Sequence, residues 1–170
     1  PYVKVSDCLV DSAATYLVTS PYRFNGVMLL ENMQGDILTD EAGGVLGSLG
    51  LMPSSCLNME AHLNPEMGKG IYGYQRIHGY YEPAHGSAPD IAGQGKANPY
   101  SQIGSVAMML EMSFGLKEEA QKVWNGLLSV FGSGYRTFEL ATKETPREKI
   151  ISTRQFGDMV ANYIRNGGIN

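Results

Sequence analysis

Residues 82–99 constrain the fold of this chain more than any other segment of similar length. They read EPAHGSAPDIAGQGKANP, with three glycines, three prolines and one of the chain's three histidines. Glycine and proline interrupt regular secondary structure and hold the backbone on a defined irregular path. Small side chains at Gly86, Ser87 and Ala88 would let another molecule approach the main chain closely. The composition predicts either a rigid surface turn or a loop that binds a ligand.

The charge and hydropathy of the chain argue against two classes of partner. Its 170 residues are 43% hydrophobic and 18% charged, and the net charge is −4. Because no run of basic residues is present, neither nucleic acid nor an anionic membrane is an expected partner. No apolar stretch reaches the roughly 18 residues that a membrane span needs. Cys8 and Cys56 lack metal-binding spacing, so we expect free thiols in a reducing compartment, the cytoplasm.

Helical patterns separated by glycine-rich breaks run along the chain. Apolar residues recur at helical spacing in 9–19, 37–46, 101–114, 117–130 and 152–164. Ser152 and Gln155 could form a capping box. The apolar run 26–30 is consistent with a buried strand, and 61–79 predict a long loop. Residues 47–55, rich in Gly, Pro and Ser, indicate a boundary between structural units. So few strands would leave helix faces uncovered. For this reason, and because the chain starts at Pro1, we expect a segment of a longer protein.

Two motifs resemble those of one enzyme family. The sequence EPAHGSAPDIAG, followed by ANP, is similar to the cofactor loop of the metal-dependent, decarboxylating 2-hydroxyacid dehydrogenases, which form the isocitrate/isopropylmalate dehydrogenase family. The words NMQGDILTD resemble the family's metal motif, with Thr39 where serine is usual. The segments GYRT, at 134–137, and STRQFGD, at 152–158, resemble the family's C-terminal segment. The resemblance covers nearly the whole chain and is strongest at 32–58 and 80–115.

The resemblance implies a fold and a division into domains. The expected fold is α/β and isocitrate/isopropylmalate dehydrogenase-like, with this chain as the C-terminal half of a two-domain α/β subunit. Residues 1–46 would end the inner, dimer-forming domain, and 47–170 would form the returning half of the cofactor domain. The family's catalytic lysine and tyrosine and its substrate-binding arginines come from sequence before Pro1. We therefore expect this segment alone to be inactive.

Three aspartates are the expected metal ligands and catalytic acids. Asp36 and Asp40 lie four residues apart, which in a helix places both carboxylates on one face. Two like charges at this spacing suit a hard cation such as Mg²⁺ or Mn²⁺, although a solvated acidic face has the same pattern. The resemblance favours the metal. It also matches Asp11, in LVDSAA, to a third carboxylate that reaches into a partner's site, which implies a homodimer with shared active sites. Asp11 is also a candidate to move the hydroxyl proton.

The resemblance also implies that the loop binds NAD. Asp90 would accept hydrogen bonds from ribose hydroxyls and repel a 2′-phosphate. With Ile91 next to it, and no Lys-Tyr pair, the loop favours NAD over NADP. The rest of the expected cofactor site comprises His85 against the adenine, Asn98 at the adenine edge, the backbone of Gly86, Ser87 and Ala88 along the phosphates and ribose, and Glu82 near the nicotinamide.

A second glycine motif is a weaker candidate. Residues 68–73, GKGIYG, formally satisfy G-x-G-x-x-G. A dinucleotide fingerprint needs a strand before it and a helix after it, and the sequence predicts neither there. We therefore do not assign a phosphate site to these residues.

The implied reaction is the oxidative decarboxylation of 3-isopropylmalate, a step of leucine biosynthesis, with NAD and Mg²⁺ or Mn²⁺. The words HGSAPDIAG are nearest to this branch of the family. Isocitrate, homoisocitrate and tartrate dehydrogenases stay open as alternatives, because the residues that read the substrate's side group lie mostly upstream of this chain. A non-catalytic regulatory subunit is a further alternative, against which the presence of all three acids argues. The chain departs from the family pattern at Gln34, where an aromatic residue is usual, and in the longer stretch 60–79.

Overall fold

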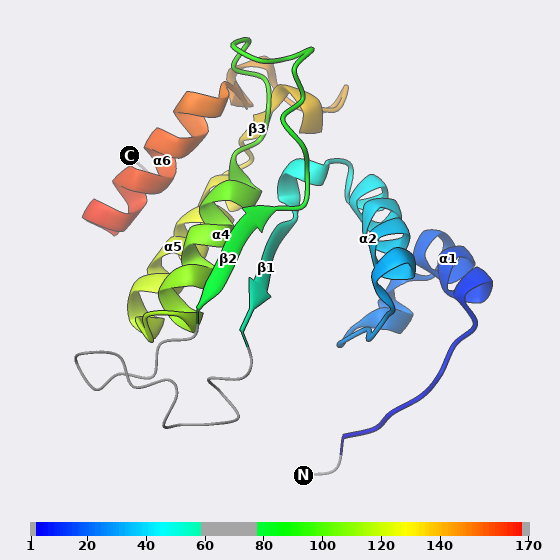
Figure 1. The fold of residues 1–170 in the computed structure, drawn as a ribbon. Helices are drawn as coiled ribbons and strands as arrows, with labels where there is room; N and C mark the ends of the chain where they lie inside the picture. Colours follow the sequence, from blue (N-terminus) through cyan, green and yellow to red (C-terminus); the bar gives the residue numbers. More distant parts are fainter. Residues whose placement is uncertain (1–2, 59–77, 168–170) are drawn as a thin grey trace. The chain divides into compact units, whose positions relative to one another are not determined.

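The computed structural model describes residues 3–58 and 78–167. The chain divides into two compact units, Pro1–Leu49 and Gly50–Asn170 (Figure 1). The sequence predicted a boundary at 46/47, and its assignment of the two parts to an inner domain and a cofactor domain stays a prediction. The motif at 68–73 and nearly all of the loop predicted at 61–79 lie outside the described residues.

Two helices packed against each other form the core of the first unit. Helix α1 spans Val10–Thr19 and helix α2 spans Asn32–Leu46, with the short 3₁₀ helix η1, Pro21–Phe24, between them. Ala13 and Leu17 of α1 pack against Leu38 of α2. Helix α2 begins earlier than the predicted residue 37, continues through two glycines and ends at Gly47 with φ 93°. Glycine adopts this left-handed conformation without steric cost.

Residues 26–30 do not form the buried strand that their apolar run suggested. Val27 is 99% exposed and Leu29 is 96% exposed, whereas Met28 and Leu30 pack on the core of the first unit. This alternation has the period of a strand. Among the described residues, however, no strand pairs with the segment, and the segment has no strand assignment. The prediction is wrong in this structure because the segment lacks a pairing partner.

A β-hairpin and three helices form most of the second unit. Strand β1, Pro53–Leu57, pairs antiparallel with β2, Gly79–Pro83, so that Ser54 lies opposite Glu82. Helix α4, Tyr100–Met112, contacts both strands; α5, Lys117–Gly132, packs on α4, and α6, Thr153–Asn166, packs on α5 (Figure 1). The helices α1, α4, α5 and α6 were predicted to within two residues at each end.

The core of the second unit lies between α5 and α6. Leu127, Val130 and Phe156 are fully buried there. Phe131 meets Phe156 edge to face, with ring centroids 5.4 Å apart. Such pairs add to the free energy gained from apolar burial. Tyr100, which directly follows residues 82–99, packs against this core.

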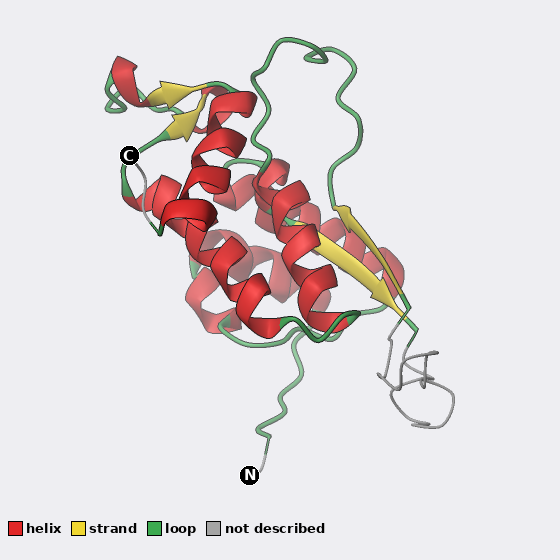
Figure 2. Cartoon of the chain, turned by 90° about the vertical axis from the view of Figure 1, so that its left-hand side faces the viewer, coloured by secondary structure: helices red, strands yellow, loops and turns green. Residues whose placement is uncertain are grey.

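Short elements connect the helices at that end. Strand β3, Arg136–Thr137, pairs in parallel with β4, Ile150–Ile151, seen beyond the ends of the helices in Figure 2. The remaining short elements are the 3₁₀ helices η2, Leu49–Leu51, η3, Phe138–Leu140, and η4, Arg147–Lys149. The predicted capping box is confirmed, since Ser152 Oγ accepts from Gln155 N and Gln155 Oε1 accepts from Ser152 N at 2.9 Å. This box fixes where α6 begins.

Candidate functional site

Residues 84–99 form a loop that leaves β2 and returns to α4 (Figure 2). At its start, Ala84 N donates to the Met52 carbonyl at 3.0 Å, which extends the hairpin by one bond. At its end, Thr153 of α6 donates to the carbonyls of Gly95 and Ala97. Within the described part of the chain, the hydrogen bonds of 85–94 stay inside the loop. The loop is therefore attached to the rest of the unit at both ends, and its middle part is free of hydrogen bonds to the other described residues.

Consecutive turns shape the middle of the loop. Ile91 N donates to the Ala88 carbonyl at 3.1 Å, and Gln94 N donates to the Ile91 carbonyl at 3.1 Å. Ala88 has φ 43°, in the left-handed region that residues with a Cβ seldom adopt. Such a conformation costs on the order of 1–3 kcal/mol and is concentrated at functional sites. Strain at Ala88 therefore marks the loop as a candidate binding element.

Gly86 leaves room beside this strained backbone. A Cβ built at Gly86 would meet no heavy atom within 4 Å, and its φ lies outside the left-handed region. Neither packing nor backbone conformation in the described structure therefore requires glycine at this position. The bare backbone beside Ser87 and Ala88 leaves space that a ligand can fill.

The loop holds His85 and Asp90 in defined ways. His85 Nδ1 lies 2.7 Å from the Gly86 carbonyl oxygen. Because a carbonyl only accepts, Nδ1 donates, and Nε2 of the neutral ring is the acceptor. Asp90 is exposed, and its own carbonyl accepts from Gln94 Nε2 at 2.7 Å. The turn is thus held through the main chain of Asp90, which leaves the carboxylate directed to solvent. Ile91 beside it is half-buried.

Glu82 lies on the open face of the hairpin. Ser55 contacts Met112, and Tyr81 contacts Ser113, at the end of α4. Because successive side chains of a strand point to opposite faces, Tyr80 and Glu82 lie on the face of the hairpin that points away from α4. A hydrogen bond to the Glu82 carboxylate, together with the negative charge of that group, raises the pKa of the Tyr80 phenol. The carboxylate is therefore oriented on an exposed strand that leads directly into the loop.

Asn98 is placed differently from its predicted role at an adenine edge. It is 2% exposed, and its side chain makes two hydrogen bonds within the protein. Nδ2 donates to Thr137 Oγ1 at 2.9 Å, and Oδ1 accepts from Tyr100 N at 2.8 Å. Direct contact between this amide and a ligand stays a prediction, and the structure gives the amide an internal role as well.

Asp36 and Asp40 lie on one exposed face of α2, as their spacing predicted. Both are exposed, and neither forms an ion pair within residues 3–58 and 78–167. Each is two residues from the buried Leu38, about 160–200° around the helix, so both carboxylates point away from α1. Two unpaired carboxylates one turn apart repel each other mildly and form a donor pair suited to a hard divalent cation.

Asp11 lies on the face of α1 that points away from α2. It lies in the first turn of α1, where Ser12 N donates to Oδ1 at 2.7 Å, and it is two residues from the buried Ala13. By the same helical geometry it points away from α2. Accordingly, the described residues contain no group of three His, Cys, Asp or Glu side chains positioned for one metal ion. Within one chain, the described position of Asp11 therefore does not join that of Asp36 and Asp40.

Three residues near the loop were not singled out from the sequence. Thr137 and Glu139 follow α5, and Thr153 opens α6, yet all three hydrogen-bond to residues 95–98. The available signal was the similarity of the segments containing Thr137 and Thr153 to the family pattern. That similarity assigned neither threonine a contact with the loop, and the structure shows both contacts.

Cys8 and Cys56 are both free thiols and exposed. No helix in the part of the chain that the structure describes has the length and apolar character needed to span a lipid bilayer. Neither finding bears on the chemistry of the loop or of the three aspartates.

Comparison with known proteins covers almost the whole chain. The family model described as isocitrate/isopropylmalate dehydrogenase matches residues 1–160. The 3-isopropylmalate dehydrogenase of Mannheimia succiniciproducens is 42% identical over 164 residues, which are 96% of this chain and 40% of that protein. The enzyme of the same name from Thermotoga maritima is 45% identical over 164 residues, with the same coverage of 96% and 40%.

Solved structures agree with the sequence relatives. The isocitrate dehydrogenase of Methylococcus capsulatus matches with a TM-score of 0.70 and 33% identity, over 92% of this chain and 40% of that one. A beta-decarboxylating dehydrogenase of Thermococcus kodakarensis matches with a TM-score of 0.69 and 31% identity, over 96% and 41%. The chain thus spans about 40% of the length of these curated relatives. Its fold is the α/β fold of these enzymes, and the chain belongs to the isocitrate/isopropylmalate dehydrogenase family.

Proposed function

We propose that this chain supplies the metal carboxylates and the cofactor loop of a cytoplasmic 3-isopropylmalate dehydrogenase of leucine biosynthesis. The enzyme would oxidise and decarboxylate its substrate with NAD and Mg²⁺ or Mn²⁺. The observation that carries the proposal is the loop 84–99, which is fixed at both ends and presents Asp90 and a strained Ala88 beside free space at Gly86. The 3-isopropylmalate dehydrogenases named above, at 42–45% identity, support the choice of substrate.

The loop fits a dinucleotide. The open space at Gly86 is where a Cβ would otherwise obstruct a ligand that lies along the main chain. Asp90 would accept hydrogen bonds from two ribose hydroxyls, and its charge would repel the additional phosphate of NADP. His85 would lie against the adenine, with its ring plane set by the bond to the Gly86 carbonyl. Glu82, at the start of the loop, would lie toward the nicotinamide, and NAD would supply the hydride acceptor.

The donor set of α2 fits a magnesium or manganese ion. Asp36 and Asp40 would bind it through carboxylate oxygens, the ligands that these hard cations prefer. When bound, the cation supplies Lewis-acid polarisation of the substrate's 2-hydroxyl and stabilises the negative charge that develops as CO₂ leaves. Asp11 of a second chain would complete the carboxylate set and is the candidate to accept the hydroxyl proton. The proposed assembly is therefore a homodimer with two shared sites.

Two inactive variants should complement each other if the sites are shared. In a heterodimer of an Asp11→Asn chain and an Asp36→Asn chain, one site has both substitutions and the other has none. With both substitutions made in the full-length protein, we expect tagged heterodimers, purified after coexpression, to have about half of the wild-type activity, whereas each homodimer has almost none. A heterodimer as inactive as its parents would contradict the shared site. A heterodimer of Asp36→Asn and Asp40→Asn chains is the matched control, because both of its sites are damaged.

The substrate is tested by turnover of the full-length protein. We expect NADH formation with 3-isopropylmalate and Mn²⁺ or Mg²⁺, at a kcat/KM about tenfold or more above those for isocitrate, homoisocitrate and tartrate. Chelation of the metal should abolish NADH formation, and adding Mn²⁺ or Mg²⁺ back should restore it. Isocitrate is the second candidate, because an isocitrate dehydrogenase is among the matching structures. Preferred turnover of any other acid would refute the substrate assignment, and no turnover of the four would favour the regulatory subunit.

A further inference from the structure

The C-terminal end of the loop is held by side chains that come from later in the chain. Asn98 N donates to Glu139 Oε1 at 2.8 Å, and Asn98 Nδ2 donates to Thr137 Oγ1 at 2.9 Å. Thr153 N donates to the Gly95 carbonyl at 2.9 Å, and Thr153 Oγ1 donates to that of Ala97. We call the four residues Asn98, Thr137, Glu139 and Thr153 the loop anchor.

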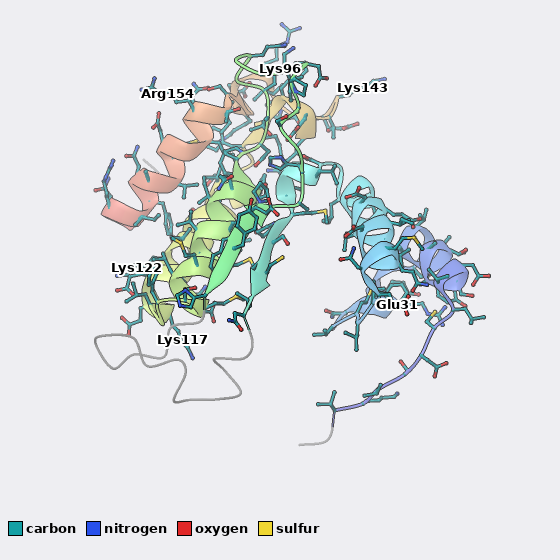
Figure 3. All side chains as sticks on the ribbon, viewed as in Figure 1. Glu31, Lys96, Lys117, Lys122, Lys143 and Arg154 are labelled. Atoms are coloured by element: carbon teal, nitrogen blue, oxygen red, sulfur yellow. The ribbon has the colours of Figure 1, made fainter. Side chains whose placement is uncertain are left out.

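The parallel pair β3–β4 explains how the loop anchor is assembled. Thr137 pairs with Ile151, which comes two positions before Thr153. The capping box at Ser152 then fixes the first turn of α6, and with it the N–H and hydroxyl of Thr153. The position of Thr137 and that of Thr153 therefore both depend on this one small sheet. The sheet lies at the same end of the unit as the loop, where Lys96 and Arg154 are also found (Figure 3).

The bond between Asn98 and Thr137 is the central member of the loop anchor. Thr137 is fully buried and Asn98 is 2% exposed, so water cannot replace a lost partner easily. Removing the Thr137 hydroxyl would leave a buried amide N–H unpaired, which costs more than the loss of an exposed hydrogen bond. Asn98 Oδ1 also accepts from Tyr100 N in the first turn of α4, so the same amide joins the loop to that helix.

We propose that Thr137 is a positioning residue for the cofactor loop, acting through the side chain of Asn98. This role rests on the proposed function, and it gives the Asn98 side chain the task of holding the loop in the conformation that presents residues 85–91. Both polar ends of the amide are engaged within the protein, and turning it toward a ligand would break two buried bonds. Thr137 thereby sets the affinity for NAD through Asn98, without itself touching the cofactor.

The test compares three threonine variants in the full-length protein. Thr137→Val keeps the shape of the side chain but removes the acceptor, Thr137→Ser restores it, and Thr142→Val removes an exposed hydroxyl that bonds Glu144 in a surface turn. We expect Thr137→Val to raise the dissociation constant and KM of NAD about tenfold, with kcat within about twofold. Amide hydrogen exchange of Asn98 and Tyr100, whose N–H groups are hydrogen-bonded at this end of the loop, should quicken in the same variant without NAD. Thr137→Ser and Thr142→Val should match the wild type within about twofold.

A general loss of stability must be separated from this effect. Val160→Ala removes volume from the buried core of α6 and is expected to lower the unfolding temperature while leaving the affinity for NAD unchanged. An affinity of Thr137→Val equal to that of the wild type, or an equal loss in Val160→Ala, would overturn the positioning role. A wild-type protein that binds no NAD would refute the proposed function and the cofactor role of Thr137 together. The exchange data would then still decide whether Thr137 holds the loop.

Discussion

Replacing Asp36 with asparagine is expected to abolish metal-dependent turnover of the full-length protein while leaving its fold intact. Asp36 is exposed on α2 and, among the described residues, forms no ion pair. The substitution is nearly isosteric, and it removes repulsion from Asp40 one turn away, so stability should be unchanged or higher by about 0.2–0.5 kcal/mol. Lewis-acid stabilisation contributes several kcal/mol to such a reaction, so kcat should fall on the order of a thousandfold or more.

The measurement pairs turnover, titrated with Mn²⁺, with thermal unfolding of the same samples. Asp158→Asn is a matched control, because Asp158 is also an exposed helical aspartate, on α6, and is paired with Arg154 at 3.8 Å. The control should keep full activity. Undiminished activity of Asp36→Asn would refute the assignment of this carboxylate as a metal ligand. Lost activity together with a collapsed unfolding transition would instead indicate a structural role for Asp36.

Changing Asp90 to lysine and Ile91 to tyrosine is expected to shift the cofactor preference from NAD toward NADP. The change removes the carboxylate that would accept ribose hydroxyls and places a cation where a 2′-phosphate would lie. Hydrogen bonds to charged groups contribute about 1.5–3 kcal/mol. Losing one for NAD and gaining one for NADP should raise the ratio of kcat/KM for NADP to that for NAD by about a hundredfold or more.

The turn should tolerate this double substitution. The bonds that hold it use the carbonyls of Ala88, Asp90 and Ile91 and the side chain of Gln94, and none of them involves the Asp90 carboxylate. Steady-state kinetics with both dinucleotides measure the preference. Asp158→Lys, which changes the net charge of the protein as Asp90→Lys does, is the control and should leave the preference for NAD unaltered. If the double variant also kept that preference, the ribose assignment would fail.

The sequence predicted the helices well and the strand-like segments poorly, for a physical reason. Helical periodicity and the Ser152–Gln155 capping box depend on residues three or four apart, so the local sequence contains them. Whether 26–30 becomes a strand depends on a neighbour to pair with, and no described strand supplies one. Helix α2 begins five residues before the first residue of its apolar repeat, Ile37, so periodicity alone did not locate its first turn.

The sequence likewise predicted some features of the candidate site and not others. Glycines and prolines predicted an irregular loop at 82–99, and similarity to the family assigned Asp90 and the three aspartates. The internal bonds of Asn98 could not be foreseen, because its partner Thr137 lies 39 positions away and reaches it only through the pairing of β3 with β4. The positive φ of Ala88 could not be predicted from the sequence either, because alanine rarely adopts that conformation and the identity of its neighbours does not require it.

The way the loop is attached has a consequence for how such proteins diverge. Residues 95–98 hydrogen-bond to β3, η3 and α6, so substitutions there would disturb the packing of the fold first. Residues 85–94 hydrogen-bond only to one another in the described structure, so under the proposed function their substitutions would act mainly on the bound ligand. Substitutions within 85–94 could therefore change the ligand without breaking the bonds that attach the loop to the rest of the unit. Attachment at the ends makes ligand choice evolvable separately from stability.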